Sequence, residues 1–488
     1  MPFRSESPAA GARSVREVAR CRALFPALLL GAFAPGQDDS VHRLFAADAA
    51  RLITHEDPVV RGEAALVLAS SHASENHTAI LAVAKDEHPD AQVRGLLALG
   101  LQGTPGVAIR LEELLEDQSS RTEPAGIAAA WALGSLAPDH APVATTRVLS
   151  SFLHGSWKRQ RDVLLALLCG MARHPQDGQA VALRRLFDEE SNRDPEVRAR
   201  LLALLLPIPD AFDGKQLRKV LDRGSEEERQ ALVAWLAANS SPFDAELLQP
   251  IERLATQSLH PHLRAQALAV LTRMRHLPAL ELAAKALRSA HAVEVAQGMR
   301  SALAIGGAGM RLALEAHLRA EQDPALQAAM LRAYAAPPSG ALTEMCARLA
   351  ADASAAIDLR IAAATTLSRA DAERAAPLLR TLFRETERPA CLLELATALQ
   401  RGDATPPALA RLMPGPVDLH QQSARWCALL ATSHPEAVLQ LLGVLGSRAA
   451  TAADLTQALR AWRTTMVVSA PAEQALILPE SLRAVLGR

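Results

Sequence analysis

The sequence is poor in aromatic residues and cysteine, and it has no excess of charge of either sign. Its 488 residues include only nine Phe, five Trp and one Tyr. This scarcity argues against a β-sandwich or barrel, because aromatic residues are prominent in the strands of such folds. The 52 Lys and Arg nearly balance the 53 Asp and Glu, so the chain lacks the basic character typical of nucleic-acid-binding domains. An apolar share of 49% excludes a disordered chain and, with the dominance of Ala and Leu, favours an all-helical fold.

The sequence also lacks the common signatures of catalysis and metal binding. It contains no GxxxxGK[ST], GxSxG or HExxH motif. Its five cysteines show neither the CxxC nor the CxH spacing of zinc sites, and we expect most of them to be small core residues. They are Cys21, Cys169, Cys346, Cys391 and Cys427. We therefore predict that the protein is not an enzyme and uses no cofactor or metal.

Residues 1–36 have the pattern of a signal peptide. Five arginines precede an apolar run over residues 23–34, which is too short for a membrane anchor. Ala34 and Gly36 offer a cleavage site before Gln37. These features predict export, to the periplasm in a bacterium, and no further transmembrane segment. The alternative is a cytoplasmic protein in which this segment is a leader to the first helix.

A short sequence motif containing proline, which we call the repeat phrase, recurs throughout the rest of the chain. The prolines that anchor it are separated by multiples of about 33 residues, which indicates a repeat architecture. They are Pro58, Pro89, Pro195, Pro261, Pro324 and Pro389. Degenerate copies begin near Glu123, Lys158, Glu226, Ala292 and Ile357, and fainter ones lie around Val417 and Ala452. The pattern predicts about 13 units, each a hairpin of two helices.

The positions within the phrase predict where helices begin and end. Asp57, Asp194 and Asp323 are N-cap candidates, and the proline that follows each suits the first helical position. Apolar residues then recur with helical spacing, as at Val60, Ala64, Ala65 and Leu68. Gly306-Gly307 predicts a turn between units.

The phrase DPxVR followed by AAxxL resembles HEAT-like repeats, particularly the short type named after phycobilisome lyase subunits. It is clearest at residues 57–68, 194–205 and 260–271. The resemblance implies an armadillo-like α-solenoid, a superhelix over residues 37–466, with a C-terminal cap at 467–488. It also implies a ladder in which each repeat arginine bonds to acidic groups of the neighbouring unit. The ladder residues would be Asp57, Arg61, Arg94, Asp194, Arg198, Arg264 and Arg360, with interruptions at Ala296 and Gln327.

A solenoid without catalytic motifs favours the function of a protein-binding scaffold with an extended concave groove. Tryptophans anchor many protein interfaces, and three of them fall late in the capped helix that begins at the repeat phrase of their units. Trp131, Trp235 and Trp426 are therefore the candidate partner-binding residues. The alternative is that they fill gaps left by alanine-rich packing.

Two other functions stay open at this point. A lyase-like or metal-dependent enzyme subunit would need a pocket in the groove, but the only His-Glu dipeptide is His55-Glu56, and one pair cannot hold two irons. A nucleic-acid-binding solenoid would need a basic face, for which the best clusters are residues 157–161, 184–185 and 273–275. Solvated helix faces with some salt bridges between units are the favoured explanation of these clusters. The excess of Ala and Arg, with five lysines, is typical of a GC-rich bacterial source.

Overall fold

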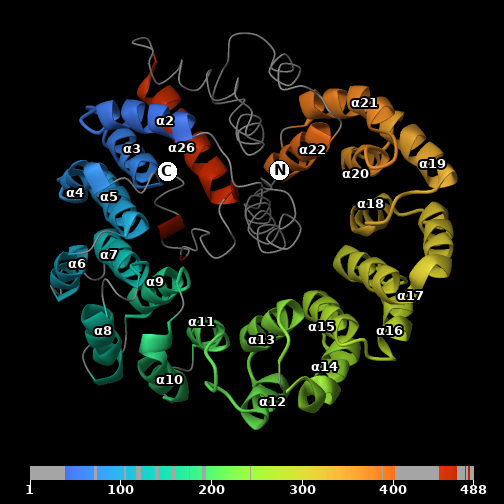
Figure 1. Cartoon of the computed structure of the whole chain (residues 1–488), viewed down its shortest axis with the longest axis horizontal. Coiled ribbons are helices and arrows are strands. Elements are labelled where there is room, and N and C mark those ends of the chain that lie inside the picture. Colours follow the sequence, from blue (N-terminus) through green and yellow to red (C-terminus); the bar gives the residue numbers. More distant parts are fainter. Residues whose placement is uncertain are drawn as a thin grey trace, which may run out of the picture.

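The computed structural model describes residues 39–70, 74–103, 106–116, 123–137, 142–154, 160–174, 176–189, 194–241, 243–386, 388–401, 450–469, 479 and 482–483. Within these ranges the protein is all-helical and contains no β-strand. Successive helices pack against one another in two rows that follow a curved path (Figure 1). The expected all-α class is therefore confirmed.

The inner row contains the helices that begin at the repeat phrase. They are α3 (Pro58–Ser70), α5 (Pro89–Gln102), α7 (Pro124–Gly134), α9 (Arg161–Met171), α11 (Pro195–Leu205), α13 (Glu226–Ala238), α15 (Pro261–Arg273), α17 (Ala292–Ala320), α18 (Pro324–Ala333), α20 (Ile357–Leu367) and α22 (Pro389–Arg401). Each packs on the next, from α3 through to α22. All six anchor prolines are thus the first residues of helices, as the repeat pattern predicted.

The outer row contains the helices that lie between the phrases. They are α2 (Asp39–Leu52), α4 (His77–Ala84), α6 (Val107–Glu116), α8 (Pro142–His154), α10 (Ala180–Asp188), α12 (Gly214–Arg223), α14 (Asp244–Gln257), α16 (Ala279–Ala286), α19 (Gly340–Ala351) and α21 (Ala372–Glu385). Short 3₁₀ turns, η1 (Ser74–Asn76) and η3 (Asp177–Gln179), precede α4 and α10. The last described helix, α26 (Ala452–Ser469), continues past Met466.

The N-caps form as the repeat phrase predicts. The Asp57 carboxylate accepts hydrogen bonds from the backbone N–H groups of Val59 and Val60 at 2.8 and 3.1 Å. Asp194 and Asp323 do the same at the starts of α11 and α18. At α5 the Nδ1 atom of His88 accepts from the N–H of Asp90 at 3.3 Å. These bonds satisfy backbone donors that a helix start leaves free.

The turn predicted at Gly306-Gly307 divides α17 into two segments. Gly307 has φ 63° and ψ −162°, a conformation that glycine adopts readily and other residues do not. The segment before this kink continues the inner row, because Glu294 bonds to Arg264 of α15 and Gly298 lies against Ala283 and Ala286 of α16. Residues 308–320 then lead into α18 as the first helix of the next hairpin.

Small residues bring the inner helices very close together. Ala128, Ala129, Ala130 and Ala132 of α7 are completely buried. At the crossing of α7 and α9, a Cβ atom on Gly134 would lie 2.2 Å from the carbonyl oxygen of Leu167. Only a residue without a side chain allows this approach, so the alanine and glycine content sets the spacing of the inner row.

We predict opposite effects of two glycine-to-alanine substitutions. Gly134→Ala should lower the free energy of unfolding by about 2 kcal/mol, because α7 and α9 must separate to admit the methyl group. Gly309→Ala adds a methyl group that would meet no neighbouring residue within 4 Å, and it should raise that free energy by up to about 1 kcal/mol. Chemical denaturation followed by circular dichroism measures both. Equal effects would contradict the close approach at Gly134.

Candidate functional site

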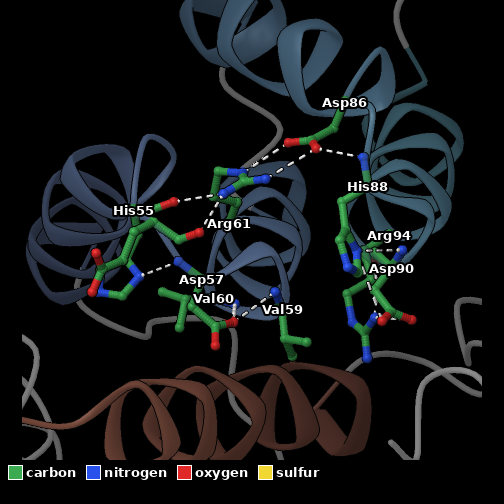
Figure 2. A network of polar contacts seen from close by, with 10 residues as sticks. His55, Asp57, Val59, Val60, Arg61, Asp86, His88, Asp90 and Arg94 are labelled. Carbon is green, nitrogen blue, oxygen red and sulfur yellow. Dashed lines mark hydrogen bonds and ion pairs between the residues drawn. The ribbon is translucent and has the colours of Figure 1, made fainter.

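The repeat arginines lie at the joints between neighbouring hairpins. Arg61 donates two hydrogen bonds to Asp86 of the next unit, from Nε at 2.7 Å and from Nη2 at 3.0 Å. Its Nη1 atom donates to the carbonyl oxygens of His55 and Glu56, which precede α3, at 2.8 and 2.9 Å. Asp86 also accepts from the N–H of His88 (Figure 2). One side chain therefore connects the turn of its own hairpin to the turn of the next.

Three other repeat arginines, at the same position of their helices as Arg61, bond in the same way. Arg198 donates to Glu228 at 3.0 Å and to the carbonyl of Phe187 at 2.7 Å. Arg264 donates to Glu294 at 2.5 and 2.8 Å and to the carbonyl of Ser258 at 2.6 Å. Arg360 donates to Glu385 at 2.8 Å and to the carbonyl of Ala350 at 3.5 Å. Each thus bonds to an acid of the following unit and to a carbonyl of its own outer helix or the residue that ends it.

Arg94 behaves differently because it lies two residues later in its helix than Arg61 does in α3. Two residues turn a helical side chain through about 200°, to the opposite face. Arg94 therefore points back toward the preceding unit and bonds to Glu63 of α3 at 3.2 Å, with both side chains completely buried. Burial lowers the pKa of Arg94, whereas the charge of Glu63 opposes that shift.

The two expected interruptions have different structures. Gln327 takes the arginine position in α18 and donates to the carbonyls of Leu318 and Glu321 at 3.2 and 3.3 Å. It keeps the bonds within its own hairpin, but its amide cannot form an ion pair with the next unit. In α17 the arginine position, fourth in the helix, is occupied by Val295, one residue before the expected Ala296, and neither side chain has a donor for these bonds.

Two acids of these joints, Asp86 and Glu294, are held in their charged form. The hydrogen bond from Arg61 lowers the pKa of Asp86 below its ordinary value. Burial alone would raise the pKa of Glu294, but hydrogen bonds from Arg264 and Ser289 outweigh burial and lower it. These shifts stabilise the folded array at neutral pH.

A second set of arginines connects the carboxyl-terminal ends of the inner helices, and sequence analysis missed it. Arg173 donates to the carbonyl of Gly100 at 3.2 Å, Arg273 to that of Leu236 at 2.8 Å, and Arg369 to that of Tyr334. We call these three residues the helix-end arginines. A cation is favourable at the negative end of a helix dipole. Burial lowers the pKa of Arg173, whose guanidinium also lies 5.9 Å from the centre of the Trp131 ring.

The candidate tryptophans have unequal positions. Trp131 is completely buried and has no exposed ring to offer a partner, so its side chain fills the core of the inner row. Trp235 of α13 is partly exposed and packs against the core with its buried side. Trp426 lies outside the described residues. Among the described residues, Trp235 is therefore the only one of the three candidates that has exposed surface for a partner to contact.

The basic clusters considered for nucleic-acid binding contain arginines that are paired with acids. Arg161 bonds to Asp194 and Glu196 at 2.6 and 2.7 Å. Arg184 bonds to Asp188 at 2.8 Å, and Arg273 bonds to Asp244 at 3.0 Å. Partial neutralisation of this kind weakens the attraction that a phosphate backbone would feel. Residues 155–159 lie outside the described part of the chain.

We examined the described side chains for metal ligands and for reactive histidines and cysteines. They contain no cluster of three or more His, Cys, Asp or Glu that could hold a metal ion. His55 is engaged locally, since its Nδ1 accepts from the N–H of Asp57 at 3.0 Å. Cys169, Cys346 and Cys391 are buried free thiols, and burial raises the pKa of Cys346 to about 12. Cys21 and Cys427 lie outside the described residues.

A shallow cleft of about 510 Å³ lies between α6 and α8 of the outer row. Glu112 and Glu116 line one side, and Val143, Thr146 and Arg147 line the other. Glu112 and Arg147 form an ion pair across it at 2.8 Å. The charges of Glu112 and Arg147 therefore neutralise each other. The apolar side chain of Val143 beside them is 64% exposed.

Comparisons with known proteins give no family for the chain. No protein-family model matches it, and no curated protein sequence matches it significantly. Among the described helices, none has the length and hydropathy needed to cross a membrane. The expected signal peptide, residues 1–36, lies outside the described residues.

We predict that the joint between α15 and α17 depends on pH. Because the pKa of Glu294 is lowered on folding, its contribution to stability is complete above the ordinary value of 4.5 and is lost as pH falls through the folded value. Glu294→Gln should therefore cost about 2 kcal/mol at pH 7 and progressively less below about pH 4. Denaturant titrations at a series of pH values measure the difference.

Glu113→Gln is the matched control. Glu113 also pairs with an arginine, Arg110, at 2.9 Å, but both side chains are more than half exposed. Its substitution should change stability by less than about 0.5 kcal/mol at any pH. A cost at Glu294 that stays constant from pH 7 to pH 3 would contradict the assignment of the ladder bond.

Proposed function

We propose that the protein is a scaffold for protein–protein interaction, in which an α-solenoid of HEAT-like hairpins presents a preformed surface to a partner. The proposal includes the superhelical form and the number of about 13 units that the repeat spacing implies. It assigns no catalytic residue, cofactor or metal to the chain. The partner would bind along the inner row of helices.

The observation that carries this proposal is the surface around Trp235. Its partly exposed ring lies on α13, in the middle of the inner row, and Ala234 and Ala238 beside it are exposed. Large aromatic side chains supply much of the affinity at protein interfaces, and small neighbours leave room for a partner to approach. Arg198 and Arg273 bond to residues of α13 and thereby hold the helix in place.

Rigid joints give such a surface an advantage in binding. A partner that meets a preorganised surface does not have to order it, so less of the interaction energy is lost. Ion pairs and helix-end arginines connect several pairs of neighbouring units between α3 and α21, and these bonds restrict movement between those neighbours. The array therefore supports binding through shape that is present before the partner arrives.

Site-specific photocrosslinking tests the proposal. We predict that a benzophenone amino acid at position 238, introduced into the full chain in cells that naturally make the protein, crosslinks one defined protein. Trp235→Ala in the same chain should reduce the crosslink at least tenfold, because an anchor tryptophan contributes about 2 kcal/mol or more. Mass spectrometry identifies the product.

A benzophenone at position 218 is the control, since Arg218 lies on α12 of the outer row with its side chain 51% exposed. The control should not yield the same product. Circular dichroism must show that Trp235→Ala remains folded. Crosslinks that are unchanged by Trp235→Ala would overturn the role of this surface.

The proposal also places the protein outside the cytoplasm, through the signal peptide at residues 1–36. Amino-terminal sequencing of the protein from its natural host tests this part separately. A mature chain that starts near Gln37 would support export, whereas a chain that keeps Met1 would overturn it.

A further inference from the structure

The last described helix packs on the first repeat. Helix α26 contacts α3, although Arg460 and Glu63 are 397 residues apart in the sequence. In Figure 1, α26 lies beside α2 and α3, on the side of α3 away from α5. It therefore covers the face of α3 that would otherwise end the inner row.

The start of α26 is well defined. The hydroxyl of Thr451 accepts from the N–H of Asp454 at 3.2 Å, and the Asp454 carboxylate accepts from the N–H of Thr451 at 2.9 Å. This reciprocal capping fixes the first turn of the helix. Leu455, Ala458 and Leu459 follow at i, i+3 and i+4, and they are 5%, 0% and 0% exposed. One face of α26 is therefore apolar and buried, with Arg460 beside it.

The polar part of the contact is a carboxylate shared by two arginines. Glu63 is completely buried and accepts from Arg94 of α5 at 3.2 Å and from Arg460 of α26 at 2.9 Å. The Arg94 side chain is fully buried, whereas that of Arg460 is 21% exposed. The two cations repel each other across the shared carboxylate.

This arrangement makes the two contacts of Glu63 unequal. If α26 leaves, Glu63 keeps its buried partner Arg94, so the α3–α5 joint retains its ion pair. The departure of Arg460 also removes a repulsive charge from Arg94. The cost of separating α26 is mainly the exposure of its apolar face and the loss of one charge-assisted bond.

We propose that this face of α3 is a docking site for an amphipathic helix and that α26 is its built-in occupant. The site recognises apolar side chains at i, i+3 and i+4, followed by an arginine that reaches Glu63. Because α26 belongs to the same chain, its docking is intramolecular. Its effective concentration at the site is therefore high, and a helix from another molecule must compete with it for the site. The inference concerns α3 and α26 and stands independently of any partner at Trp235.

A fluorescent peptide of residues 452–469 is the probe, and fluorescence anisotropy measures its binding to the full-length chain. The wild-type site is occupied, so the peptide should bind weakly. Arg460→Glu in the chain places a carboxylate against Glu63 and releases α26. The peptide should then bind at least about tenfold more tightly than to the wild-type chain, because the competing segment is gone.

Two controls isolate the docking site. Ala453→Glu also adds a carboxylate to α26, but at an exposed position, and this chain should bind the peptide as weakly as wild type does. A peptide that itself carries Arg460→Glu should not bind the opened chain. Adding Glu63→Gln to the Arg460→Glu chain should weaken binding of the wild-type peptide, because its arginine loses the carboxylate.

Hydrogen exchange of α3 gives a readout that does not depend on the peptide. Release of α26 should speed amide exchange in residues 58–70 of the Arg460→Glu chain and leave α13 unchanged. A folded Arg460→Glu chain with wild-type exchange in α3 and no gain in peptide binding would overturn the proposal. If the wild-type chain formed concentration-dependent oligomers in which α26 of one copy docks on α3 of another, the claim that α26 binds its own chain would be wrong.

Discussion

The fold depends on one constraint, which is that a helical hairpin of this size cannot bury its apolar face alone. Each inner helix from α5 to α20 packs between two inner neighbours, and α3 packs between α5 and α26. Helix α7, buried from Gly126 to Gly134, shows how complete this cover becomes. Stacking by apolar contact would leave the angle between units loosely defined. Four of the repeat arginines, Arg61, Arg198, Arg264 and Arg360, fix the direction of stacking, because each guanidinium bonds to a carbonyl of its own hairpin and to an acid of the next. Arg61 and Arg264 do so with two bonds to one carboxylate, which fixes orientation as well as distance.

The same constraint creates a problem at the ends of the array. An inner helix without a neighbour would expose an apolar face, and repeat proteins commonly cover such faces with a capping element. At α3 the covering element is α26, which is the last described helix of the same chain. Glu63 differs from the other ladder acids because it bonds to arginines on two sides of α3. Glu63 therefore bonds to a neighbouring helix on each side of α3, namely α5 and α26, although only α5 follows α3 in the order of the repeats.

Much of the fold could be predicted from the sequence, because caps, prolines and glycines act locally. Pro58, Pro195 and Pro324 begin helices for reasons that lie within four residues of each. The helix-end arginines could not be found in this way, since Arg173 bonds to Gly100, 73 residues away, and no local pattern marks that contact. Arg94 belongs to the same phrase as Arg61, but a shift of two positions reverses its direction. Trp131 and Trp235 have similar places in their helices and differ in exposure, because burial depends on how closely the neighbouring units pack.

The chain balances 52 basic residues with 53 acidic ones, and the structure shows how many of these charges are used. Many of its arginines bond to acids or to helix ends inside the array, so they determine how units stack. Arginine suits this role better than lysine, because its planar fork can hold a carboxylate and a carbonyl at the same time. Side chains committed to these joints contribute little to recognition at the surface. Specificity for a partner would therefore come from the few exposed apolar groups, such as the Trp235 ring, and from the shape that the arginines maintain.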